Sequence, residues 1–175
     1  DSGMMGEPTN DAPGSFWTAS IEEAAERLAA ILREENADVL TVYDDHGTYG
    51  HPDHIQVHRV GMRAAELAGT PKVFQATMNR DQVERSRAES PSPDGVEAPE
   101  LGEDFGSPEA IITTAVDVSA YVTYKRKAMR AHASQISEES FFLALPDEPF
   151  AMAFGTEWFI RVGAPPGLAE TDLFD

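Results

Sequence analysis

A short apolar run followed at once by a crowded polar loop constrains this chain most. Residues 39–43, Val-Leu-Thr-Val-Tyr, are rich in β-branched and aromatic side chains, which is typical of a buried strand. Apolar residues at helical spacing precede the run, and they start after Ser20 and Glu23, which have the spacing of a helix capping box. A helix, a short link and a buried strand in this order predict an α/β sheet.

The rest of the chain continues the same alternation. We expect one α/β domain over residues 1–175, with a Rossmann-like, mostly parallel sheet and helices on both faces. Residues 82–108 are acidic and rich in proline, glycine and serine, so we expect a flexible loop within the domain. The further predicted elements are helices over 53–68 and 120–136 and strands over 72–76, 110–118 and 158–162.

Composition excludes several classes of function. The chain contains no cysteine, so disulfides and thiolate metal sites are excluded. Thirteen basic against 31 acidic residues give a net charge of −18, which argues against nucleic-acid binding. No apolar run is long enough to cross a membrane. A soluble, cytoplasmic protein is the simplest interpretation.

The polar loop leads into a histidine cluster. Residues 49–58 hold three of the five histidines: His51, His54 and His58. On a helix, side chains three or four positions apart share a face, and imidazoles beside a carboxylate suit zinc. The spacing alone is weak support, because histidines on helix faces are more often structural. The position is more informative, since loops at the carboxyl ends of strands build the binding crevice of α/β sheets.

The string Tyr49-Gly50-His51-Pro52-Asp53-His54 resembles the second signature of the LmbE-like, or PIG-L, zinc-dependent N-deacetylases. The similarity is greatest to the branch that contains the mycothiol-biosynthesis deacetylase and the mycothiol S-conjugate amidase. It extends along most of the chain, through the strings at residues 1–4, 13–17, 43–45 and 130–135.

The resemblance implies a role for each residue of the signature. His54 would be a zinc ligand. His51 would stabilise the tetrahedral intermediate or protonate the leaving amine. Asp53 would hydrogen-bond an imidazole and fix its tautomer. Tyr49 would donate a hydrogen bond to the carbonyl oxygen, as a mobile oxyanion donor.

The same resemblance implies a substrate and a cofactor. Asp1 and Met4 would line a pocket for the sugar of a small amino-sugar conjugate. The cofactor would be Zn²⁺, with other divalent metals possible because nitrogen and oxygen ligands discriminate poorly between them.

The first signature of the family, His-Pro-Asp-Asp, does not occur in these residues; the one His-Pro-Asp string begins at His51. We therefore expect the first βα unit to be lacking here and an N-terminal segment of the same protein to supply two more ligands and the general base. Local substitutes are weaker candidates. His58 is interpreted as a hydrogen-bonded helix residue and His132 as a surface or capping residue. His46 could face substrate, and Asp44 could orient the signature loop.

Three functions remain open on these grounds. The first is a metal-dependent hydrolase that removes an N-acetyl group from a small molecule containing N-acetylglucosamine. The second is a mycothiol S-conjugate amidase, which would have to accommodate a bulky S-substituent. The third is a truncated, non-catalytic domain that binds a sugar or a partner.

Overall fold

The computed structural model describes residues 2–89, 101–102 and 105–174, and within them a four-stranded sheet has the order β1-β2-β4-β3. β1 (Val39–Tyr43) is parallel to β2 (Lys72–Thr77). β4 (Thr156–Arg161) is antiparallel to both β2 and β3 (Thr114–Asp117), so β1, β2 and β3 run in one direction and β4 runs in the other. The predicted α/β class, with a mostly parallel sheet, is confirmed.

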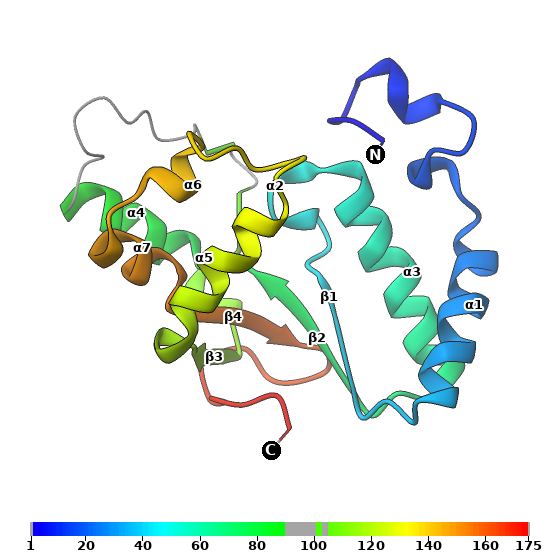
Figure 1. Cartoon of the computed structure of the whole chain (residues 1–175). Helices are drawn as coiled ribbons and strands as arrows, with labels where there is room; N and C mark the ends of the chain where they lie inside the picture. Colours follow the sequence, from blue (N-terminus) through cyan, green and yellow to red (C-terminus); the bar gives the residue numbers. More distant parts are fainter. Residues whose placement is uncertain (1, 90–100, 103–104, 175) are drawn as a thin grey trace.

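Helices flank this sheet (Figure 1). α1 and α3 lie together on one side, and α5 and α7 lie on the other. Among the described residues, no helix is both long and apolar enough to cross a membrane. The α-helices are α1 (Ile21–Glu34), α2 (Gly47–Gly50), α3 (Pro52–Ala68), α4 (Arg80–Glu89), α5 (Val122–Ala131), α6 (Phe141–Ala144) and α7 (Asp147–Phe154), and the 3-10 turns are η1 (Pro8–Asp11), η2 (Phe16–Thr18), η3 (Glu109–Ile111) and η4 (Ser119–Tyr121).

Small side chains bring α1 and α3 close together. The Ser20 hydroxyl accepts a hydrogen bond from the Glu23 N–H, so the predicted cap of α1 is confirmed. Ala29 of α1 and Ala64 of α3 have no exposed surface and belong to one apolar cluster. Alanines in such a contact allow two helices to pack closely without losing rotamer freedom. This contact fixes α3, whose first turn carries the histidine signature.

The other face of the molecule contains aromatic packing. Phe74 of β2 and Phe159 of β4 are buried and meet edge to face, with ring centroids 6.2 Å apart. The guanidinium of Arg126 on α5 lies 4.0 Å above the ring of buried Phe150 on α7. This cation–π contact ties α5 to α7 and explains one of the basic residues of α5 structurally.

The predicted loop over residues 82–108 is wrong in its first part, because residues 82–89 belong to α4. The Asn79 side chain accepts a hydrogen bond from the Gln82 N–H and so caps the helix. No proline or glycine follows until Pro91, so nothing in the sequence stops the helix earlier. Residues 90–100 and 103–104 of the predicted loop lie outside the described residues.

Two other predicted boundaries shift by four residues or more. The strand predicted from residue 110 begins at Thr114, because residues 109–111 form a 3-10 turn after Pro108. The helix predicted to reach residue 136 ends at Ala131. His132 is the C-cap of this helix and has ψ near +40°, and turn bonds from the His132 and Gln135 N–H groups replace the helical pattern.

Candidate active site

The histidine signature lies at the carboxyl end of β1, where α2 connects the strand to α3 (Figure 1). Pro52 occupies the first turn of α3, where its missing N–H leaves no donor unsatisfied. Gly47 has φ +68°, and a Cβ there would lie 2.8 Å from the Cβ of His54. Glycine at this position therefore lets the loop backbone pass close to the start of α3.

His54 is held as a neutral imidazole. Its ring stacks on Tyr43, with centroids 3.9 Å apart and planes within 3°. Its Nδ1 donates to the Gly47 carbonyl at 3.2 Å, which leaves Nε2 as the unprotonated nitrogen. Burial lowers the pKa of His54 and outweighs the Gly47 carbonyl, which acts in the opposite direction. A neutral imidazole with a defined tautomer has the chemistry of a metal ligand.

His51 is the N-cap of α3. Its Nδ1 accepts a hydrogen bond from the Asp53 N–H at 3.1 Å, so a neutral His51 ring carries its proton on Nε2. The ring centroid lies 4.9 Å from that of His54. The structure therefore places a proton-carrying nitrogen of one histidine and a lone pair of the other in the same small region.

The Asp53 carboxylate makes a contact that the sequence did not predict. It accepts hydrogen bonds from the Ser2 hydroxyl at 2.5 Å and from the Ser2 N–H at 3.0 Å. Burial would raise the pKa of Asp53, but the two bonds from Ser2 and the nearby His51 lower it overall. The predicted bond between this carboxylate and an imidazole stays a prediction. The bonds that the structure shows for the carboxylate join it to Ser2 and so hold residues 2–18 against α3.

Tyr49 approaches both histidines edge-on. Its ring centroid is 5.0 Å from His54 and 6.2 Å from His51. Partial burial, with a smaller contribution from nearby Tyr43, raises the pKa of Tyr49. The phenol therefore remains protonated at neutral pH and can donate a hydrogen bond to an oxygen that gains negative charge.

Residues 2–18 lie against the start of α3. Ser2 is fully buried, and its hydroxyl also accepts bonds from the Ser15 hydroxyl and the Trp17 N–H. Buried Asn10 donates to the carbonyls of Ser2 and Met4. Met4 itself is 44% exposed, which is compatible with the predicted contact to a substrate. Asp1, the other predicted pocket residue, lies outside the described residues.

Ser2 and Asn10 were missed by the sequence analysis. A small polar residue in a loop has no periodicity that would mark it as buried. The one available signal was that Ser2 falls inside the string at residues 1–4 that carries the family resemblance.

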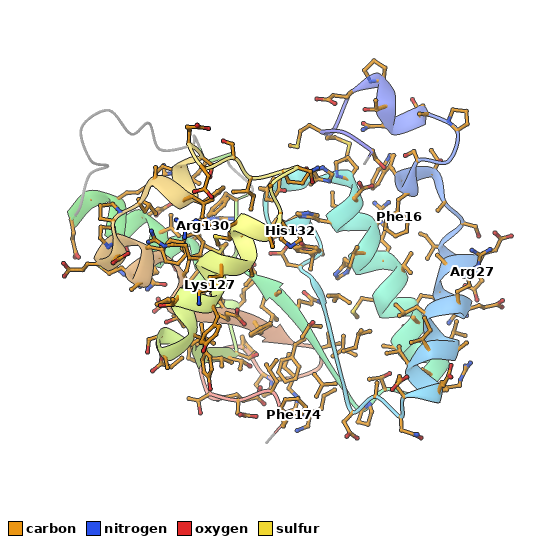
Figure 2. All side chains as sticks on the ribbon, viewed as in Figure 1. Phe16, Arg27, Lys127, Arg130, His132 and Phe174 are labelled. Atoms are coloured by element: carbon orange, nitrogen blue, oxygen red, sulfur yellow. The ribbon has the colours of Figure 1, made fainter. Side chains whose placement is uncertain are left out.

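The remaining candidate residues differ in their exposure and in the contacts that they make. His58 Nδ1 donates to the Tyr43 carbonyl at 2.9 Å, so its interpretation as a hydrogen-bonded helix residue is confirmed. His132 is exposed and lies at the end of α5, as Figure 2 shows, in agreement with a surface or capping residue. Asp44 is 1% exposed, and its Oδ2 lies 3.4 Å from Nε2 of His46. These last two atoms make no hydrogen bond with other described atoms.

His54 fits one position of a zinc site, as an imidazole whose second nitrogen is held by a backbone carbonyl. The residues that the structure describes contain no group of three or more histidine, aspartate or glutamate side chains that could hold a metal. They therefore fit part of a zinc site and not a complete one.

Comparisons with known proteins match these residues to one family. The family model for GlcNAc-PI de-N-acetylase, PIG-L, matches residues 5–65, which include the signature and α3. Proteins named 1D-myo-inositol 2-acetamido-2-deoxy-alpha-D-glucopyranoside deacetylase are similar over almost the whole chain. The one from Thermobifida fusca is 42% identical over 99% of this chain and 67% of its own length. This chain belongs to the PIG-L family.

Two further PIG-L relatives carry the same name. The protein from Nocardiopsis dassonvillei is 43% identical, over 99% of this chain and 68% of its own length. The protein from Thermomonospora curvata is 40% identical, over 98% of this chain and 63% of its own length. The chain thus spans about two thirds of the length of these relatives.

Proposed function

We propose that this chain forms part of the active site of a metal-dependent hydrolase. The reaction removes the N-acetyl group from a small molecule that contains N-acetylglucosamine and yields acetate and a free amino sugar. The observation that carries the proposal is the meeting of His51, His54 and Tyr49 at the carboxyl end of β1. The names of the relatives favour deacetylation over the amidase alternative. The cytoplasmic location stays a prediction.

Zinc is the proposed metal, and His54 is its proposed ligand in this chain. A bound zinc ion would lower the pKa of water toward neutrality and polarise the acetyl carbonyl. His54 contributes a nitrogen whose lone pair is directed by the Nδ1 bond to Gly47. Because a catalytic zinc site needs about three protein ligands, the proposal assigns the other ligands and the general base to an N-terminal segment of the same polypeptide.

The other signature residues act on the amide itself. In its neutral form, His51 carries a proton on Nε2, because Nδ1 accepts from Asp53, so it can donate to the carbonyl oxygen. In its protonated form, it can give that proton to the leaving amine. The protonated phenol of Tyr49 supplies a second donor to the carbonyl oxygen.

The test uses the full-length polypeptide with His54→Ala and His51→Ala. We expect His54→Ala to lose zinc and activity, and His51→Ala to keep zinc but lose turnover by about 100-fold or more, as expected for a proton-transfer group. Zinc content is measured by elemental mass spectrometry. Activity is measured by acetate release from the inositol-linked acetamido sugar that appears in the names of the relatives.

Arg27→Ala is the control, because Arg27 is exposed on α1, far from the signature in Figure 2. It should leave zinc content and acetate release unchanged. Wild-type zinc content together with wild-type activity in His54→Ala would refute the ligand assignment. Cleavage of a cysteinyl amide in preference to the acetamido sugar would establish the amidase instead.

A further inference from the structure

The residue before Tyr49 has an unusual backbone conformation. Thr48 has φ +67° and ψ −42°, a combination that L-residues with branched side chains rarely adopt. A residue in this region persists where its surroundings hold it, and such residues often lie at functional sites. The direction in which Tyr49 leaves the loop depends on this conformation, since Tyr49 directly follows Thr48 in the chain.

The peptide group before Thr48 is fixed by Asp44. The Thr48 N–H donates to Oδ1 of Asp44 at 2.5 Å, and Asp44 is almost fully buried. Asp44 is itself held by the sheet, because its N–H donates to the carbonyl of Ala76 at the end of β2. The acceptor for Thr48 is therefore part of the rigid scaffold and not of the loop.

The peptide group after Thr48 is fixed from another segment. The Gly106 N–H donates to the Thr48 carbonyl at 2.7 Å. The Arg80 guanidinium, at the start of α4, donates from Nε to the Phe105 carbonyl at 2.7 Å and from Nη2 to the Gly106 carbonyl at 2.8 Å. A planar guanidinium can hold two adjacent carbonyls at once, which a lysine ammonium cannot do with the same geometry.

Both peptide groups that flank the Thr48 Cα are thus held, one by Asp44 and one through Gly106 by Arg80. Together they determine φ and ψ of Thr48. We propose that Asp44 and Arg80 are positioning residues, which keep the phenol of Tyr49 beside His51 and His54. This inference rests on the proposed function for its catalytic consequence, whereas the hydrogen bonds themselves can be tested without it.

The kinetic test compares Arg80→Ala, Arg80→Lys, Asp44→Ala and Asp44→Asn in the zinc-loaded full-length polypeptide. We expect Arg80→Ala and Asp44→Ala to lower kcat by about 10- to 100-fold, as a displaced catalytic group does, with zinc content and KM almost unchanged. Asp44→Asn should recover most of the activity, because its amide oxygen can still accept from Thr48. Arg80→Lys, which keeps the charge but not the fork, should fall between wild type and Arg80→Ala.

Arg85→Ala is the matched control. Arg85 lies on the same helix, but it pairs with the Glu109 carboxylate instead of loop carbonyls. It should keep wild-type kcat. In a Tyr49→Phe background, Arg80→Ala should cause little further loss, because the hydroxyl that Arg80 positions is already absent. An equal loss in both backgrounds would show that Arg80 acts on general structure, and the inference would be refuted.

Amide hydrogen exchange separates this inference from the proposed function. The Thr48 and Gly106 N–H groups should exchange faster in Arg80→Ala than in wild type or Arg85→Ala. Faster exchange in Arg80→Ala, together with a wild-type protein that has no deacetylase activity, would refute the function and leave the positioning intact. An active wild type whose Arg80→Ala variant has unchanged exchange and unchanged kcat would refute the positioning and leave the function intact.

Discussion

Asp53 shows how one residue can serve two neighbouring parts of a site. Its backbone N–H donates to the ring of His51, and its carboxylate accepts two bonds from Ser2. The bond from the N–H orients the imidazole of His51, and the two bonds to the carboxylate hold residues 2–18 against α3. The ionised carboxylate favours both Ser2 bonds, because a protonated carboxyl group offers fewer acceptor sites to Ser2.

The contact between Ser2 and Asp53 should make stability depend on pH. The pKa of Asp53 is lowered in the folded protein, although burial opposes this, because Ser2 donates to the carboxylate. The resulting stability is present above the ordinary carboxyl pKa of about 4 and is lost as the pH falls through the lowered pKa. Ser2→Ala should therefore reduce the free energy of unfolding by about 1–2 kcal/mol at pH 7, and the difference should narrow as the pH falls below about 4.

Urea unfolding at several pH values measures this difference. Ser137→Ala is the control, because Ser137 is exposed and lies far from α3 in the sequence. A Ser2→Ala difference that stays constant from neutral to acid pH would show that the hydroxyl contributes by packing or by accepting from Ser15 and Trp17, and not through the ionised carboxylate.

The signature residues could be found from the sequence, but the hydrogen bonds that hold them in place could not. Tyr49, His51 and His54 stand in a string of unusual composition directly after a strand, and the structure brings all three together. The partners of Asp53 and Thr48 lie 51 and 58 positions away, at Ser2 and Gly106. Contacts at such separations depend on the packing of whole elements, which local periodicity does not encode.

At the scale of elements, α3 and β1 approach closely at one glycine. A Cβ on Gly61 would lie 2.3 Å from Cγ1 of Val42, which is shorter than any normal contact. In an exposed helix, glycine-to-alanine substitution stabilises by about 1 kcal/mol. Here the steric conflict should dominate, because Val42 is buried in β1 and cannot move away freely.

We therefore predict that Gly61→Ala lowers the free energy of unfolding by about 1–3 kcal/mol. The double variant Gly61→Ala with Val42→Ala should lose less than the sum of the two single losses, because it removes the methyl group that the new Cβ would contact. Chemical denaturation of the two single variants and the double variant measures the coupling. Additive losses in the double variant would contradict the close approach.

The elements with clear periodicity were predicted well. β1 has the predicted bounds, and the cap of α1 is the predicted serine. The failure at α4 has a physical cause, since Val83 and Ala88 are its two apolar residues and none of its residues is buried. A helix without an apolar face gives no 3.6-residue pattern, so its cap at Asn79 was the one local signal.

At the scale of the whole molecule, charge is the dominant property. The net charge of −18 creates repulsion that favours the expanded, unfolded chain. Ion pairs offset little of it, because pairs such as Arg63–Glu22 and Arg130–Glu138 join partly exposed side chains. Exposed pairs of this kind contribute little to stability, because solvent screens the attraction between their charges.

Added salt should therefore raise the melting temperature. Screening weakens the repulsion among 31 acidic residues more than it weakens a few surface pairs, since the screening length falls from about 30 Å at 0.01 M to about 8 Å at 0.15 M. Calorimetry in sodium chloride, with sucrose of equal osmolarity as the control, tests this. A melting temperature that falls as chloride increases would show that the surface pairs outweigh the repulsion.

The bonds between Ser2 and Asp53 also distinguish a docked state of residues 2–18 from an undocked state. They join stretches 51 residues apart, and we expect the docking of residues 2–18 on α3 to be an equilibrium with its own constant. If Met4 contacts the sugar, as the family resemblance implies, substrate binds the docked state alone. Its apparent affinity is then the intrinsic affinity reduced by the docked fraction, and the substrate in turn shifts that fraction upward. Under that condition, the Ser2 hydroxyl would affect substrate affinity without contacting the substrate.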